Sequence, residues 1–274
     1  MVNPKFIAKI ESEEPTLRFA VLIDADNVSA SVIEGLLAEI ATFGEATVKR
    51  IYGDFTSPTS AQWKKVLNKN AIKPVQQFAY TTGKNATDST LIIDAMDLLY
   101  TRRFNGFCLV SSDSDFTGLA IRIREEGLTV LGFGEQKTPE AFRNACHKFI
   151  LTEVLRPVDS KDNETALTPI FEIKKTKIPL VATNPIASVA DQTTNEIPIA
   201  FLLQSLEKTC DENGWARLAD FGSYLTKLQP DFEPRSFGFK KLSELIKAKP
   251  GIFHLEERQV SNSSGKVLCV CAKK

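Results

Sequence analysis

Acidic residues stand directly after two apolar runs of this sequence. The run FAVLI is followed by Asp24, Asp26 and Asn27. The run GFCLV is followed by SSDSD, which contains Asp113 and Asp115. Carboxylates that lie close together repel one another, so either their pKa values rise or a cation neutralises them. Because the motifs offer oxygen ligands and contain no His or Cys, they favour Mg²⁺ or Mn²⁺ over zinc.

The elements that must position these acids alternate between strands and helices. Short apolar runs predict strands over residues 17–23, 46–52, 74–80, 106–111 and 128–134. Periodic segments predict helices over residues 31–42, 59–69, 86–100, 116–126 and 139–150. Strands that are apolar on both faces and alternate with helices imply an α/β fold with a parallel sheet flanked by helices on both faces. Ligands bind outside the carboxyl ends of the strands in such a sheet, which is where the acids stand.

Two further acids reach the same edge of the predicted sheet. Asp54 follows the second strand, and Asp88 opens the helix over residues 86–100. At 100° per residue, Asp88 shares the apolar stripe of this helix with Ala95, whereas Asp94 lies off that stripe and is expected to face outward. A carboxylate on the inward stripe of a first helical turn is unusual. We therefore expect Asp88 to point toward the other acids.

Each acid taken singly also has a structural explanation. Asp115 or Ser114 could cap the helix that follows, Asp88 could cap its own helix, and Asp26 could form an Asx-turn. Independent caps need not fall on strand ends that converge, so the set as a whole favours a functional cluster. Divalent ions held by aspartates activate water and stabilise a phosphodiester while it is cleaved. The acids therefore predict a hydrolytic metal site.

The composition of the sequence changes after residue 155. Four prolines and many Thr, Ser, Asn and Lys residues predict a linker over residues 156–195, with a short docked strand at IFEI or IPLVA. Helices are then expected over residues 197–214, 216–230 and 233–251, followed by a two-stranded hairpin formed by IFHLEER and KVLCVCA. This order predicts a small winged-helix-like α+β domain.

Basic residues gather on the third of these helices. Residues 196–274 carry 12 Lys and Arg against 10 Asp and Glu, a net charge of +2. Arg235, Lys240 and Lys241 could neutralise the phosphates of RNA, or they could form a solvated face. Phe237 and Phe239, which lie among them, fit core packing better than base stacking.

Five stretches of the first part resemble the NYN domain, the PIN-like metal-dependent ribonuclease fold of the LabA type. They are FAVLIDADNVS, RIYGDF, GKNATDSTLIIDAMDLLY, GFCLVSSDSDFTGLAIRIREEGLTVLGFGE and TPEAFRNACHKFI. They occur in order over roughly residues 17–155. The resemblance implies a PIN-like sheet and a ribonuclease that depends on Mg²⁺ or Mn²⁺.

The resemblance also implies a role for individual residues. The predicted metal ligands, which are also the predicted catalytic acids, are Asp24, Asp88, Asp113 and Asp115. Asn27 is the companion amide of the first of them and is counted with the catalytic residues.

Five residues are secondary candidates. Asp94 falls on a further acidic position of the family, and Asp54 is either functional or an exposed turn residue. Ser112 and Ser114 could orient water or phosphate. Lys84 precedes the Asp88 helix and could bind a phosphate, although an exposed loop lysine is the simpler reading.

The second part resembles the OST-HTH module, also called LOTUS, over the stretch from GWARLADFG to GIFHLEE. The resemblance implies binding of RNA, G-rich in some members, or of a protein partner. The predicted organisation is therefore an NYN/PIN-like nuclease domain over residues 1–155, a linker over 156–195 and an OST-HTH/LOTUS domain over 196–274.

The composition sets limits on location and partners. The chain has 274 residues with 34 Lys and Arg against 34 Asp and Glu, so no global field draws it to a polyanion or a membrane. No run of 18 apolar residues predicts a membrane span, and the N-terminal stretch does not predict a secretory signal. Five cysteines without a Cys-x-x-Cys spacing fit a reduced, cytoplasmic setting. The sequence leaves open whether the chain forms a homo-oligomer.

Three functions were weighed. A metal-dependent ribonuclease whose second domain binds single-stranded or structured RNA, or a protein, fits the acids best. A non-catalytic RNA-binding adaptor on a nuclease-like scaffold is the alternative. Phosphoryl transfer of the haloacid dehalogenase kind is prompted by the Asp-x-Asp of LIDADN. That motif continues with a Thr or Val after its second Asp, whereas here Asn27 and Val28 follow Asp26 directly, so the match is only partial.

Overall fold

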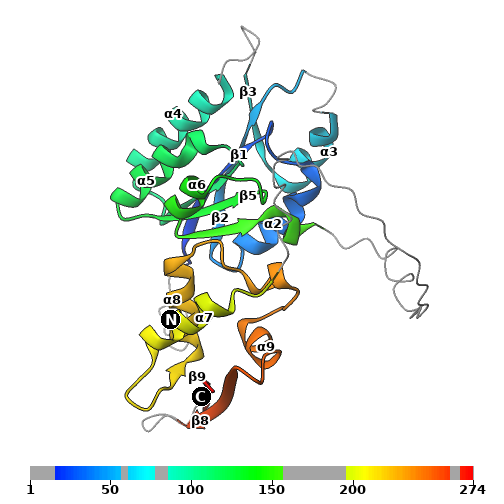
Figure 1. Cartoon of the computed structure of the whole chain (residues 1–274). Helices are drawn as coiled ribbons and strands as arrows, with labels where there is room; N and C mark the ends of the chain where they lie inside the picture. The colour runs from blue at the N-terminus through cyan, green and yellow to red at the C-terminus, as the bar shows by residue number, and fades with distance from the viewer. Residues whose placement is uncertain (1–15, 57–60, 78–85, 157–195, 260–265, 274) are drawn as a thin grey trace, which may run out of the picture.

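Six parallel strands form the sheet of the first domain, in the order β3-β2-β1-β4-β5-β6 (Figure 1). The structure is a computed structural model that describes residues 16–56, 61–77, 86–156, 196–259 and 266–273. The strands are β1 Arg18–Asp24, β2 Glu45–Gly53, β3 Lys73–Gln76, β4 Gly106–Val110, β5 Thr129–Gly134 and β6 Lys148–Leu151. The helices are η1 Ala30–Val32, α2 Ile33–Ile40, α3 Ala61–Asn70, α4 Ala86–Tyr100, η3 Ser114–Phe116, α5 Thr117–Glu125, α6 Glu140–Ala145 and η4 Thr152–Leu155. The predicted α/β class is confirmed.

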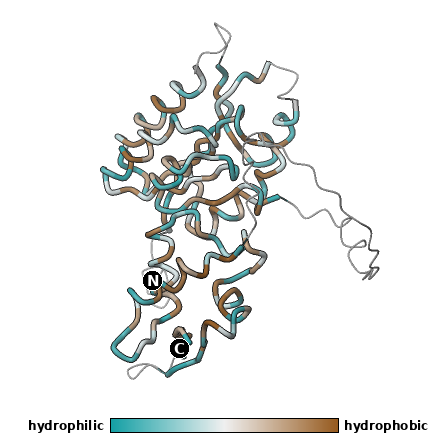
Figure 2. Tube along the Cα trace, in the orientation of Figure 1, coloured by the Kyte–Doolittle hydropathy of each residue, from teal (hydrophilic) through white to brown (hydrophobic). Residues whose placement is uncertain are grey.

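Two apolar cores cover the two faces of this sheet. Along β1, Val21 and Ile23 face the core that β1 shares with α2 and α3. Ala20 and Leu22 face the core shared with α4, α5 and α6. Successive side chains of a strand point to opposite faces, so a central strand must be apolar at every position. Figure 2 shows hydrophobic stretches within the sheet and hydrophilic residues at the outer turns.

The helix expected over residues 139–150 is wrong in its second half. The chain forms α6 and then a sixth strand, β6, which pairs with β5. Phe149 of β6 is fully buried and lies over Gly132 of β5, where a Cβ would come within 2.5 Å of the ring. The run KFIL is too short to show a strand period in the sequence. Its packing partner therefore decides its conformation.

Gly127 and Pro139 mark two helix ends of the first domain. Gly127 follows α5 with φ +77°, the left-handed conformation typical of a helix-ending glycine. Pro139 is the N-cap of α6. The Thr138 hydroxyl donates to the carbonyl of Glu135 at 2.6 Å and so does not cap the helix. The start of the predicted second helix (residues 59–60) and the end of the predicted third strand (residues 78–80) lie outside the described residues.

The second domain combines helices with a three-stranded antiparallel sheet in the order β7-β9-β8. Its elements are α7 Ile199–Thr209, β7 Ala216–Arg217, α8 Leu218–Leu228, η6 Pro234–Phe237, α9 Leu242–Lys247, β8 Phe253–Gln259 and β9 Lys266–Ala272. The hairpin is confirmed, and β7 adds a strand that was not predicted. The first helix ends before Gly214, and Gly238, with φ +84°, divides the third into η6 and α9. The docked strand expected in the linker lies outside the described residues.

The second domain packs against the edge strand β6 of the first (Figure 1). The Phe149 amide of β6 donates to the carbonyl of Pro230 at 2.9 Å. Arg143 of α6 pairs with Asp231 at 2.6 Å, and both side chains are largely shielded from water. A backbone bond and a shielded ion pair therefore fix the second domain on this edge. Within the described ranges, no helix has the length and apolar character needed to cross a membrane.

Candidate metal centre

Three carboxylates form a cluster that we call the acidic triad. Asp113 follows β4, Asp115 lies in η3, and Asp88 lies in the first turn of α4. One carboxylate oxygen from each of the three lies within 4.8 Å of the other two. The structure thus brings together three of the four predicted ligands. One comes from α4 and two come from the turn that follows β4. The inward direction expected for Asp88 agrees with this geometry.

The turn after β4 presents the two carboxylates of SSDSD. Asp113 is the N-cap of η3, and its Oδ1 accepts a hydrogen bond from the Asp115 amide at 3.0 Å. The Asp113 amide in turn donates to Ser111 Oγ at 3.1 Å. The cap was expected at Ser114 or Asp115 and lies instead at Asp113. Capping occupies one oxygen of the Asp113 carboxylate and leaves the other for a ligand, so the two roles are compatible.

Asp24 lies beneath the triad and is fully buried. Its carboxylate accepts hydrogen bonds from Asn27 Nδ2 at 2.7 Å, from Ser111 Oγ at 2.8 Å and from the Asp26 amide at 3.1 Å. Burial raises its pKa, and these three donors act in the opposite direction. The carboxylate is therefore held in one orientation, with Ser111 joining it to the turn that carries Asp113. Its service as a metal ligand stays a prediction.

The first turn of α4 is fixed against the β1 loop. Leu91 and Ala95 bury the inward face of the helix on the sheet. Thr87 Oγ1 donates to Asp26 Oδ2 at 3.3 Å, which joins the start of the helix to the loop after β1. Ser111 and Thr87 were not singled out in the sequence, because only the assembled edge shows which hydroxyls meet the acids.

Negative charge gathers around Asp88 in this cluster. The pKa of Asp88 is raised to about 6, first by burial and then by the negative charges of Asp24, Asp113, Asp115 and Asp26. A carboxyl group that holds its proton because of neighbouring anions is stabilised in its ionised form by a cation. Three carboxylate oxygens within reach of one point, with no His or Cys among them, suit Mg²⁺ or Mn²⁺. The donor set therefore fits the predicted ion.

The secondary candidates lie around the triad and not in it. Asp54 accepts hydrogen bonds from Gln76 Nε2 at 2.8 Å and from the Thr56 amide at 2.9 Å, within the turn after β2. Ser112 Oγ accepts from the Glu135 amide at 2.9 Å and is buried.

Ser114 and Lys84 are the other two candidates for binding phosphate. Ser114 is exposed in η3 beside the triad, and its carbonyl accepts from the Thr117 hydroxyl at 2.5 Å. Lys84 lies outside the described residues. Both stay predictions as phosphate-binding residues.

Asp94 faces the sheet, so the expectation that it faces outward is wrong. Its carboxylate accepts hydrogen bonds from Arg50 and from the hydroxyl of Tyr52, both on β2. The buried stripe of α4 is centred between Leu91 and Ala95, closer to Asp94 than the helical projection assumed. Burial and the Asp94 charge raise the pKa of Tyr52. Asp94 therefore ties α4 to β2.

Replacing Asp94 by Asn is expected to lower the free energy of unfolding by about 1 kcal/mol, because the charge that pairs with Arg50 is lost while an acceptor for Tyr52 is kept. Chemical denaturation of the two proteins measures this. The affinity for Mn²⁺ is expected to change less than twofold, and a loss of more than tenfold would mean that Asp94 belongs to the metal site.

The basic residues of the second domain divide into two groups. Arg235 donates to both carboxylate oxygens of Glu39 at 2.8 Å, and its Nε donates to Glu233 at 3.1 Å. These pairs favour a role in joining the domains over a phosphate contact. Lys240 and Lys241 are exposed. Phe237 and Phe239 are partly buried and pack against the core of the second domain, as expected.

Comparison with known families agrees with both halves of this geometry. The profile of the NYN domain matches residues 18–153, which span the parallel sheet and the acidic triad. The profile of the OST-HTH/LOTUS domain matches residues 194–264. The chain carries an NYN domain followed by an OST-HTH/LOTUS domain. The two resemblances expected from the sequence are confirmed.

Three solved structures are similar to parts of this chain. An uncharacterized protein from Nitrosomonas europaea shares 44% identity over 35% of this chain and 93% of that one, with a TM-score of 0.28. A protein from Chromobacterium violaceum shares 30% identity over 27% of this chain and 77% of that one, with a TM-score of 0.23. A protein of unknown function from Vibrio parahaemolyticus shares 18% identity over 51% of this chain and 95% of that one, with a TM-score of 0.44. Among proteins with curated functions, no similar sequence was found.

Proposed function

We propose that this protein is a ribonuclease that depends on Mg²⁺ or Mn²⁺ and whose OST-HTH domain recruits RNA or a protein partner. The observation that carries the proposal is the acidic triad in an NYN domain, at the carboxyl edge of the sheet. A bound divalent ion would supply charge that activates water and stabilises the phosphodiester during cleavage.

The residues of the chain have distinct proposed roles. Asp88, Asp113 and Asp115 bind the ion, and without it their charges would repel the phosphates of RNA. Asp24 holds Ser111 and, through it, the turn that carries Asp113. Asn27 orients Asp24 by donating to its carboxylate. The substrate therefore binds productively only after the ion has neutralised the cluster.

Cleavage of a fluorescent single-stranded RNA by the full chain tests the proposal. We expect cleavage with Mn²⁺ or Mg²⁺ and none with EDTA, and less cleavage of single-stranded DNA of the same sequence. RNA that is bound and stays intact with both ions would contradict the proposal and favour the non-catalytic adaptor. The five cysteines are all unpaired, which supports a reducing compartment such as the cytoplasm as the place of action.

Lys240 and Lys241 are the proposed phosphate contacts of the OST-HTH domain. Replacing both by Gln is expected to weaken RNA binding about 3- to 10-fold at low salt and to reduce the salt dependence by about 2 released counterions. Fluorescence anisotropy over a range of salt concentrations, with EDTA to prevent cleavage, measures both effects. Lys208→Gln, an exposed lysine in the last turn of α7, is the matched control. Equal losses in the control would contradict a specific contact.

A further inference from the structure

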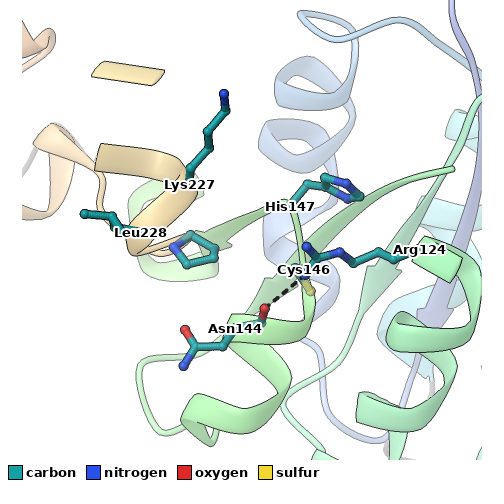
Figure 3. A pocket seen from close by; sticks show the side chains of 7 residues that line it. Arg124, Asn144, Cys146, His147, Lys227 and Leu228 are labelled. Carbon is teal, nitrogen blue, oxygen red and sulfur yellow. Dashed lines mark hydrogen bonds between the residues drawn. The ribbon is translucent and has the colours of Figure 1, made fainter. Parts of the chain in front are cut away.

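A pocket of about 300 Å³ lies where the two domains meet. Figure 3 shows that side chains from both domains line it. The NYN side of its wall comes from the end of α5 and the segment between α6 and β6, and the other side comes from the end of α8. These segments stand at the amino ends of β5 and β6, whereas the triad stands at the carboxyl ends of the strands. The pocket is therefore a separate site.

Docking of the domains forms this pocket. Pro230, which lines it, accepts the hydrogen bond from the Phe149 amide of β6 at 2.9 Å. The ion pair between Arg143 and Asp231, the residue after Pro230, also joins the two domains. A ligand in the pocket would touch both domains at once and would therefore favour the docked arrangement.

The hydrogen-bonding groups of the pocket are fixed as donors. The Val130 amide donates to Nδ1 of His147 at 3.0 Å, so the neutral ring carries its proton on Nε2. Nη1 of Arg124 donates to the carbonyls of Asn144 and Ala145, each at 3.2 Å, which holds the guanidinium at the wall. The N–H groups of this guanidinium and the Nε2–H of His147 can only donate hydrogen bonds, which suits a ligand rich in acceptor oxygens.

The charge of the pocket is positive. Arg124 lies on one side and Lys227 of α8 on the other, and the described residues that line the pocket include no Asp or Glu. Burial lowers the pKa of His147, and the charge of Arg124 lowers it further. Two cations and fixed N–H donors around one space suit an oxyanion with several acceptor oxygens.

We propose that this interdomain pocket binds a phosphate group between Arg124, His147 and Lys227. Its volume admits a phosphate together with an attached sugar, so the phosphate belongs either to a free small molecule, such as inorganic phosphate or a mononucleotide, or to the backbone of RNA. The site does not depend on the ribonuclease proposed above, because none of its residues belongs to the triad.

Proton NMR of the imidazole rings tests the site directly in the full chain. The chain contains only His147 and His254, so the two sets of ring signals can be assigned with one His147→Gln variant. Adding inorganic phosphate at constant pH and ionic strength, with chloride as the reference salt, is expected to move the His147 signals in a saturable way and to leave those of His254 in place.

A matched pair of lysine variants locates the phosphate. Lys227→Gln is expected to weaken phosphate binding about 3- to 10-fold, whereas Lys208→Gln, an exposed lysine of the same domain outside the pocket, is expected to bind as the wild type does. His147 signals that do not respond to phosphate, or equal losses in the two variants, would overturn the proposal.

The source of the phosphate is decided by a second titration. A single-stranded RNA is added in EDTA, which removes the divalent ion and so leaves the proposed cleavage out of the measurement. Saturable movement of the His147 signals by this RNA, blocked by inorganic phosphate, assigns the site to the RNA backbone. Movement by inorganic phosphate or AMP alone assigns it to a small phosphate ligand.

Discussion

Replacing Asp113 by Asn is expected to lower the single-turnover rate of Mn²⁺-dependent RNA cleavage by at least about 10³-fold. The amide oxygen of Asn can still accept from the Asp115 amide, so the cap of η3 is kept. The substitution removes one negative charge from the triad and one anionic ligand from the proposed ion. The loss would therefore report on metal-assisted chemistry and not on the fold.

A control on the helix that carries Asp88 makes this result specific. Asp97→Asn changes an exposed aspartate of α4 and is expected to retain full activity. Thermal unfolding in EDTA should show that Asp113→Asn is folded. A variant that is folded, binds RNA and cleaves within about tenfold of the wild type would contradict the role given to Asp113.

Replacing Asp88 by Asn is expected to stabilise the metal-free protein at about pH 8 by about 1–2 kcal/mol, after allowance for solvent screening. The native pKa of Asp88, about 6, lies above its ordinary value of 3.8. The native state therefore holds this proton more tightly than the unfolded chain. Its stabilising contribution is complete below about pH 4 and is lost as the pH rises through about 6. Asn mimics the protonated side chain at every pH.

The same substitution is expected to abolish stabilisation by Mn²⁺. The wild type should gain about 2.7 kcal/mol at a free Mn²⁺ concentration a hundred times its dissociation constant. Urea denaturation of both proteins, with EDTA and with Mn²⁺, at about pH 5 and pH 8, measures the two effects together. A wild type more stable than Asp88→Asn in EDTA at the higher pH would contradict the claim that burial and neighbouring carboxylates disfavour the ionised form of Asp88.

The sequence predicted the site better than it predicted the surroundings of the site. Asp88 and Asp113 could be brought to one edge because parallel strands end together and because a helical period shows which face is buried. The direction of Asp94 could not be found in this way. Its partners, Arg50 and Tyr52, are two residues apart on β2, and only the observed packing of α4 shows that they meet it.

Two other features depended on contacts that a single segment does not contain. The strand β6 is four residues long, and its conformation depends on the space that Gly132 leaves for Phe149. Arg235 was grouped with the RNA-binding lysines because its neighbours in sequence are basic, but its partner Glu39 lies in the other domain. The contact with Glu39 therefore favours a structural role for Arg235, whose charge alone had suggested RNA binding.

The central claim is that the acidic triad holds a divalent cation. A crystal of the full chain soaked with Mn²⁺ tests it most directly, by anomalous scattering at the manganese edge. We expect one or more anomalous peaks within about 2.0–2.3 Å of carboxylate oxygens from Asp88, Asp113 and Asp115. Carboxylates that converge as described with no Mn²⁺ between them at saturating concentration, or Mn²⁺ bound only elsewhere, would contradict the claim.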